Sequence, residues 1–308
     1  MRIGINGFGR IGRAIYRVNN LDPDINIVVV NDINPDTENI FYTLKYDTLY
    51  GMIDNISLDN SYIINSRHNN KTKIISNKNI NEVNWSEFNL DYIVDSSGVV
   101  KSVKDSKKLI DKNVIKKVFC TFSPDIEDFT MVLGANENDF DVLKHNLIST
   151  SICDASALAP ALKVINDLFE IKNGYVTTLH PLLSYQNLLD GPSSSWSVPG
   201  DIYHHYALGR SIIGNLIPKP TTALDVALKS INGIDAKKMG CFSYRTPTSI
   251  ICSADLSLTL KKKSSKSEII NLFTDLHKKQ KFNIFQNIFD PLVSLDFLRT
   301  SYSCNIDH

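Results

Sequence analysis

The sequence predicts an α/β fold, with a doubly wound parallel sheet followed by an α+β catalytic domain that has a mostly antiparallel sheet. The chain has 308 residues, longer than a single hydrophobic core usually grows, so two domains are expected. The first half alternates short β-branched runs with helical stretches, as parallel βαβ units do. The second half begins with a long helical pattern and continues with longer strand-like runs. We expect one domain over residues 1–150 and a second over 151–308.

In the first half, alternating β-branched and helical runs predict the order of strands and helices. Strands are expected at residues 2–6, 25–31, 91–97, 116–122 and 130–136, and helices near 10–19 and 104–112. Residues 54–90 interrupt this rhythm with short polar runs and turns, which indicates an insertion into the sheet.

The second half predicts a helix at 153–170 and strands at 175–180, 239–246 and 250–260. The last of these alternates apolar and polar residues, which is typical of a half-solvated antiparallel sheet. Between the first two strands lies a loop over Asp190–Tyr206, rich in Ser, Pro and Gly. Long loops of this kind usually carry function.

Composition excludes several functional classes. Lysine plus arginine equals aspartate plus glutamate, at 33 each, so the chain lacks the basic field of a nucleic-acid binder. Five cysteines form no CxxC pair, which argues against a disulfide framework or a zinc site and favours a reducing compartment. No charged leader and no apolar run of about 20 residues is present, so we expect a cytoplasmic protein with no membrane partner.

A glycine pattern follows the first strand. Gly7 permits a tight turn, Gly9 lets the backbone approach a pyrophosphate, and Gly12 lets helix and strand pack closely. The next strand ends at Asp32, about 20 residues further on, where a carboxylate can accept both ribose hydroxyls and would repel a 2′-phosphate. The pattern predicts a Rossmann-type domain that binds NAD; the alternative is a glycine-rich turn with a chance acid downstream.

A thiol stands at the start of the predicted helix of the second half. Cys153 directly precedes the apolar helical pattern, and a helix N-terminus favours the thiolate. His180 ends the following strand-like run, and an imidazole there could pair with the thiolate and exchange protons with a substrate. A satisfied histidine at a strand end is the alternative. We expect no metal site among the seven histidines.

Several motifs in order resemble the glyceraldehyde-3-phosphate dehydrogenase family, in its phosphorylating, tetrameric glycolytic form. The resemblance covers almost the whole chain: INGFGRIGR at 5–13, VVVNDI at 28–33, LKYDTLYG at 44–51, SICDASALAPALKVINDLFEI at 151–171, TTLH at 177–180, DGP at 190–192, SYRTP at 243–247 and DPLVSLDF at 290–297.

The resemblance implies roles for individual residues. It makes Cys153 the nucleophile and His180 the base. It implies cofactor contacts at Gly7, Gly9, Arg10, Ile11, Gly12, Asp32, Ser97, Gly98 and Thr121. It implies substrate or phosphate contacts at Ser151, Ile152, Asp154, Thr221, Thr222, Arg245 and Arg210.

The implied reaction is attack of the thiolate on glyceraldehyde 3-phosphate, hydride transfer to NAD, and release of the thioester by inorganic phosphate as 1,3-bisphosphoglycerate. The implied assembly is a homotetramer. A guanidinium suits phosphate through two parallel hydrogen bonds, which gives Arg245 a physical rationale of its own.

The chain also departs from the family pattern. The family reads S-C-T-T-N-C where this chain reads I-C-D-A-S-A, so Asp154 replaces a phosphate-binding threonine. Leu183 stands where another phosphate-binding threonine is usual, and the family continues past the equivalent of His308, so the second domain is expected to be shorter than in the family. Two alternatives follow. One is a paralogue that oxidises another aldehyde or hydrolyses the thioester, and the other is a non-catalytic binding or assembly homologue.

Overall fold

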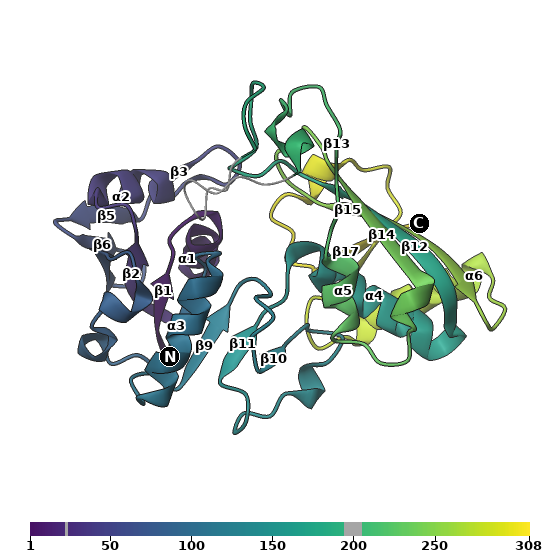
Figure 1. Cartoon of the computed structure of the whole chain (residues 1–308), viewed down its shortest axis with the longest axis horizontal. Helices are drawn as coiled ribbons and strands as arrows, with labels where there is room; N and C mark the ends of the chain where they lie inside the picture. The colour runs from purple at the N-terminus through teal and green to yellow at the C-terminus, as the bar shows by residue number, and fades with distance from the viewer. Residues whose placement is uncertain (22–23, 194–204) are drawn as a thin grey trace. The chain divides into compact units, whose positions relative to one another are not determined.

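The computed structural model describes residues 1–21, 24–193 and 205–308 (Figure 1). The chain forms two compact units. The first comprises Met1–Thr130 and Phe140–Thr150, and the second comprises Met131–Asp139 and Ser151–His308. None of the described helices is both long enough and apolar enough to cross a membrane.

The first unit is built on a nine-stranded sheet with the order β10-β11-β9-β8-β1-β2-β7-β6-β5. The pairs from β10 to β7 are parallel, and β6 and β5 extend one edge in antiparallel fashion. The strands are β1 (Arg2–Asn6), β2 (Asn26–Asp32), β5 (Ile56–Asp59), β6 (Tyr62–Asn65), β7 (Asn70–Ser76), β8 (Tyr92–Asp95), β9 (Lys117–Cys120), β10 (Phe129–Thr130) and β11 (Leu147–Ser149). The predicted doubly wound parallel sheet is therefore confirmed.

Both faces of this sheet are buried. Val29 packs into one hydrophobic cluster and the next residue, Val30, into another, because successive side chains of a strand point to opposite faces. The helices of the unit are α1 (Arg10–Leu21), α2 (Thr37–Lys45) and α3 (Val100–Asp111), and a short hairpin pairs β3 (Tyr46–Asp47) with β4 (Gly51–Met52). Parallel sheets need cover on both faces, which explains the nearly continuous apolar runs in the central strands.

Two predictions about this half differ in outcome. The segment 54–90 does insert strands, since β5, β6 and β7 join the main sheet. The strand expected at 130–136 is wrong: β10 ends at Thr130, and the chain then turns, with Ala135 N donating to Val132 O and Gly134 at φ +83°. Val132 and Ala135 are buried in the core of the second unit, so their apolar character reflects that packing.

The second unit contains a four-stranded sheet with the order β13-β14-β12-β15. Only the β12–β14 pair is parallel, so the predicted mostly antiparallel sheet is confirmed. Its elements are α4 (Cys153–Phe169), β12 (Ile171–His180), β13 (Ile217–Lys219), α5 (Ala223–Leu228), β14 (Met239–Arg245), β15 (Ser253–Leu260), α6 (Lys266–Lys279), β16 (Phe285–Ile288) and β17 (Cys304–Asp307).

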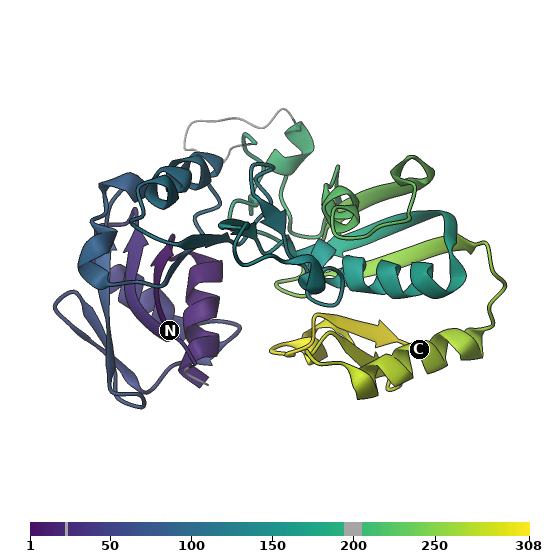
Figure 2. The same ribbon diagram turned by 90° about the horizontal axis from the view of Figure 1, so that it is seen from below.

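Helix α4 is packed on two sides. Leu158 and Leu162 belong to the cluster beneath the four-stranded sheet, and Ala161 belongs to a second cluster with Phe273 of α6 and Phe285 of β16. Figure 2 shows α4 running between the sheet and the C-terminal α6, β16 and β17 layer. This two-sided burial fixes the helix axis and so fixes the position of its first residue, Cys153.

Candidate active site

Cys153 is the first residue of α4, and its side chain is exposed. The chain approaches it through Ser151, which has a φ of +70°, a conformation that is sparsely populated for residues other than glycine. Strain of this kind persists where surrounding structure holds it and is common next to reactive groups. The first amides of α4 and the positive end of its dipole favour a negative charge on the adjacent sulfur.

His180, the last residue of β12, lies beside this thiol. Its Nε2 atom is 3.3 Å from Cys153 Sγ, and its Nδ1 atom is 2.7 Å from the carbonyl oxygen of Pro181. A carbonyl oxygen only accepts, so Nδ1 carries a proton and Nε2 is the atom that can exchange one with the sulfur or with a ligand. The buried ring is thus held in one tautomer and one orientation.

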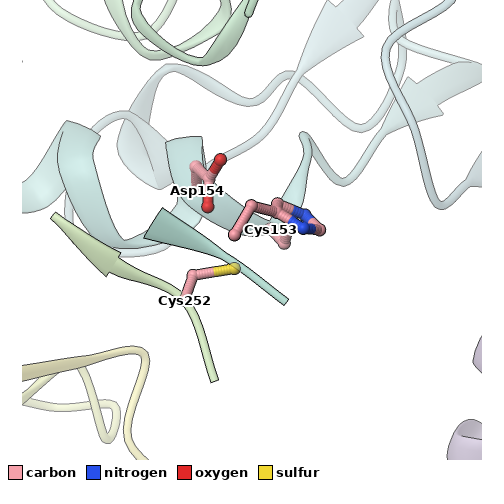
Figure 3. A group of neighbouring side chains, drawn as sticks. Cys153, Asp154 and Cys252 are labelled. Atoms are coloured by element: carbon pink, nitrogen blue, oxygen red, sulfur yellow. The ribbon is translucent and has the colours of Figure 1, made fainter. Parts of the chain in front are cut away.

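A second thiol, which the sequence did not reveal, completes the group. Cys252 follows Ile251, whose φ of +73° places a β-branched residue in the left-handed region and turns the chain just before β15. Figure 3 shows Cys252 directed toward the start of α4. A hydrogen bond from the Cys252 thiol and the neighbouring His180 ring lower the pKa of Cys153, and this bond together with burial raises the pKa of Cys252.

Asp154 directly follows Cys153 and is only 7% exposed. Its Oδ1 atom is buried and has no hydrogen-bond partner among the described residues. Burial and the negative charge on Cys153 raise the pKa of this carboxyl. A buried carboxylate oxygen without a donor costs free energy, so this oxygen is available to a ligand, a water or an ion.

Arg245 is brought beside His180 by strand pairing. The parallel register of β12 and β14 sets His180 opposite Arg245 at the ends of the two strands. The arginine side chain is buried, its Nη2 donates to Tyr185 Oη at 3.4 Å, and its Nε has no partner among the described residues. Thr246 ties the two strand ends together, because its N and Oγ1 both donate to His180 O. A buried guanidinium with an unused donor is suited to an anion.

The remaining residues expected at the substrate site stand at the starts of two helices of the second unit. Ser151 and Ile152 directly precede Cys153, and Ile152 is the N-cap of α4. Thr221 and Thr222 precede α5, where Thr221 Oγ1 accepts from Ala223 N.

Arg210 is an exposed residue whose Nε lies 3.0 Å from Asp190 Oδ2, so its charge is paired within the loop region. Of the predicted long loop Asp190–Tyr206, residues 194–204 lie outside the described residues. Gly191 N, near the start of the loop, donates to the carbonyl oxygen of Gly209, which follows the loop.

The first unit holds the residues expected at the dinucleotide site. Gly7 has a φ of +89°, and a Cβ added there would lie 2.5 Å from Ser97 Cα. A Cβ on Gly12 would lie 2.4 Å from Gly7 O, whereas a Cβ on Gly9 would meet nothing within 4 Å. Gly9 therefore faces open space at the start of α1, as a glycine that admits a pyrophosphate should. Arg10 and Ile11 form the exposed first turn of α1.

The other expected cofactor residues lie at the ends of the parallel strands of this unit. Asp32 ends β2 and accepts hydrogen bonds from Phe8 N and Asn34 N. Asp95 ends β8, and its carboxylate accepts hydrogen bonds from the N and the Oγ of Ser97. Its backbone carbonyl oxygen accepts a hydrogen bond from Thr121 N. Gly98, at φ +71°, completes this turn. Ligands of such sheets bind outside the carboxyl ends of the strands, so these residues fit a dinucleotide.

Comparison with known proteins gives the same picture for both halves. Residues 1–103 match the model of the glyceraldehyde 3-phosphate dehydrogenase NAD-binding domain, and residues 152–308 match the model of that enzyme's C-terminal domain. Among curated proteins, the chain is 33% identical over 308 residues to glyceraldehyde-3-phosphate dehydrogenase of Debaryomyces hansenii, covering 99% of this chain and 87% of the relative. It is 30% identical to glyceraldehyde-3-phosphate dehydrogenase 1 of Bacillus cereus, covering 99% and 87%. It is also 30% identical to the cytosolic enzyme of Chlamydomonas reinhardtii, covering 100% and 86%.

Proposed function

This chain belongs to the glyceraldehyde-3-phosphate dehydrogenase family of NAD-dependent oxidoreductases, and we propose that it oxidises glyceraldehyde 3-phosphate through a thioester on Cys153, with inorganic phosphate as the acyl acceptor. The observation that carries this proposal is the 3.3 Å approach of Cys153 Sγ to His180 Nε2 at the start of α4. Nucleophile and base stand within contact distance, and the Pro181 carbonyl orients the base.

The proposed first step is addition of the Cys153 thiolate to the aldehyde carbon. The new C–S bond leaves negative charge on the former carbonyl oxygen, and the protonated His180 supplies a proton to that oxygen from Nε2. The now neutral Nε2 takes the same proton back as the carbon–hydrogen bond breaks. Bound NAD supplies the acceptor for the hydride. A thioester on Cys153 remains, and attack by a phosphate oxygen on its carbonyl releases the acyl phosphate and restores the thiolate.

Arg245 is proposed to hold a phosphate group of the substrate or of the acyl acceptor. Its guanidinium is buried beside His180, and one donor, Nε, is unused. Buried charge-assisted hydrogen bonds to phosphate contribute about 1.5–3 kcal/mol each, enough to position an anion against the nucleophile. Ser151, Ile152, Thr221 and Thr222 are proposed to complete the phosphate-binding surface.

The acyl acceptor is tested by following NADH formation from glyceraldehyde 3-phosphate at varied phosphate concentration. We expect a single turnover without phosphate and continuous turnover with it. Continuous turnover that is independent of phosphate would overturn phosphorolysis. Loss of all NADH formation, with NAD still bound in calorimetry, would overturn the proposed aldehyde.

A second candidate reaction is favoured by one observation. Asp154 places a buried carboxylate with an unpartnered Oδ1 beside the thiol, at a position where the family pattern has a threonine. Such a carboxylate repels an incoming phosphate and can accept a proton from water. Hydrolysis of the thioester to the free acid would then replace phosphorolysis, and the same phosphate titration separates the two outcomes.

The assembly and location are also proposals. We propose a homotetramer, from the family resemblance of the chain. We propose a cytosolic location from the balanced charge and the absence of a CxxC pair, and one of the relatives is described as cytosolic.

A further inference from the structure

Four potential metal ligands meet at the start of α4. They are the thiols of Cys153 and Cys252, the carboxylate of Asp154 and the imidazole of His180, and their donor atoms all lie within 4.8 Å of one another. The residues come from the first turn of α4, the end of β12 and the turn before β15. Figure 3 shows the Cys252 sulfur facing the Cys153 and Asp154 side chains.

The separations are close to those of a zinc site. Tetrahedral zinc binds sulfur at about 2.3 Å and nitrogen or oxygen at about 2.0–2.2 Å, which places neighbouring ligands about 3.3–3.8 Å apart. Cys153 Sγ and His180 Nε2, at 3.3 Å, already have this spacing, and no other pair needs to close by more than about 1.5 Å. Side-chain rotation at Cys252 and Asp154 can supply such a movement.

The donor chemistry also selects the ion. Two thiolates and an imidazole favour zinc over magnesium or calcium, which prefer oxygen ligands. The proton on His180 Nδ1 is held by Pro181 O, which leaves Nε2 as the ligating atom, and such a second-shell carbonyl is typical of zinc-bound histidines. Asp154 Oδ1 is buried without a partner, and a cation would satisfy it.

Charge and access are compatible with an ion. Zinc with two thiolates and one carboxylate carries a net charge of about −1, and the charge of the Arg245 guanidinium interacts favourably with Asp154. Cys153 is exposed while Asp154 and His180 are buried, so the group has one open side through which an ion can enter.

We propose that Cys153, Cys252, Asp154 and His180 bind one Zn²⁺ ion. Binding releases to solvent the proton of the Cys252 thiol and the proton shared by Cys153 Sγ and His180 Nε2, and it forms two Zn–S bonds and one Zn–N bond with no change in oxidation state. Because the ion would occupy the sulfur of Cys153 and Nε2 of His180, metal-bound protein cannot use either in covalent chemistry. Zinc binding itself does not depend on the proposed function.

Metal binding is measured on the full chain after chelator treatment and desalting, with a phosphine reductant present. Titration with Co²⁺ is expected to give one ion per chain, with tetrahedral visible bands and a sulfur-to-cobalt charge-transfer band that Zn²⁺ abolishes. Cys252→Ser is expected to weaken Zn²⁺ binding about 100-fold or more, and Asp154→Asn to weaken it by at least about 10-fold. Cys304→Ser, which alters a thiol outside the group, serves as the matched control and should bind like the original chain.

A second measurement uses the unaltered chain, so it is insensitive to misfolding of a variant. Alkylation followed by peptide mass spectrometry should show that Zn²⁺ protects Cys153 and Cys252 together, with the same concentration dependence. Equal affinity of Cys252→Ser and the original chain, or protection of Cys153 while Cys252 reacts unchanged, would overturn the proposal. Neither readout requires turnover, so failure of the proposed reaction would leave this test intact.

Discussion

At Cys153, three neighbours act on one sulfur. The start of α4 supplies its dipole and free amides, His180 supplies a ring nitrogen at 3.3 Å, and Cys252 donates a hydrogen bond. Burial opposes these effects, yet the pKa of Cys153 remains lowered. The thiolate is therefore the form we expect at neutral pH.

This leads to a prediction for cysteine alkylation in the presence of a chelator. An ordinary thiol loses reactivity about tenfold for each pH unit below about 8.5, because only the thiolate reacts. A lowered pKa keeps the thiolate as pH falls, so the rate at Cys153 should change little between about pH 9 and pH 6. Burial raises the pKa of Cys120 to about 12, which makes that thiol the internal slow-reacting control.

Removal of the base sharpens this measurement. His180→Asn should steepen the pH dependence at Cys153 toward that of an ordinary thiol, because the cation beside the sulfur is lost. A flat profile that survives this substitution would place the cause elsewhere, and equal rates at Cys153 and Cys120 would refute the thiolate.

The sequence predicted Cys153 and His180 because each stands at the end of a recognisable periodic run. Cys252 had no such signal. It is 99 positions after Cys153 in the chain, and its approach depends on the left-handed backbone of Ile251, a conformation that nothing in the residue type indicates. The proposed zinc site could not be predicted from the sequence, because its group of four ligands includes Cys252.

At the scale of elements, the turn from β1 into α1 separates packing from ligand binding. Gly12 is needed by the fold, since an added Cβ would lie 2.4 Å from Gly7 O. The fold does not require glycine at position 9, since a Cβ added to Gly9 would have no atom within 4 Å. A glycine that the folded chain does not require is best explained by a ligand that approaches its backbone.

Gly9→Ala and Gly12→Ala should therefore fail in different ways. We expect Gly9→Ala to keep the melting temperature within about 2 °C and to weaken NAD binding about 10-fold or more. We expect Gly12→Ala to lose about 1–3 kcal/mol of stability through overpacking. Calorimetric NAD titration and thermal unfolding provide the two readouts, and unchanged NAD affinity in Gly9→Ala would remove the turn from the cofactor site.

Element prediction succeeded where periodicity and packing agreed, and failed where they did not. The helix from Cys153 was recognised from its apolar spacing, and it ends at Phe169. The run at 130–136 was predicted to be a strand because it continues the strand–helix rhythm of the first half, but Val132 packs into a core of the second unit that α4, α5 and β12 share. A local pattern of apolar residues indicates that a side chain is buried, but it does not indicate which element it packs against.

At the scale of the whole molecule, the chain carries equal numbers of basic and acidic residues, so we expect anionic ligands to be held by local groups, and Arg245 is the residue proposed for this. The types of the two larger sheets were predicted from the sequence, because βαβ units indicate a parallel sheet in one half and alternation indicates an antiparallel sheet in the other. The strand orders and the two-stranded sheets were not predicted. The assembly of chains could not be derived in this way, since it depends on surfaces rather than on periodic cores.

The proposed homotetramer yields one prediction for this scale. Sedimentation equilibrium of the full chain should give the mass of four chains, with dissociation only at low protein concentration. A measured mass equal to that of one chain at micromolar concentration would contradict the proposed homotetramer.

Covalent aldehyde chemistry at Cys153 is the central claim, and trapping of the thioester tests it most directly. The full chain is mixed with NAD and glyceraldehyde 3-phosphate in phosphate-free buffer, quenched in acid and digested for mass spectrometry, with Cys304→Ser as a positive control. We expect one NADH per chain and the acyl mass on the peptide that contains Cys153, and we expect added phosphate to clear that acyl group. NADH formation with no acyl group on Cys153, or an acyl group on another cysteine, would contradict it.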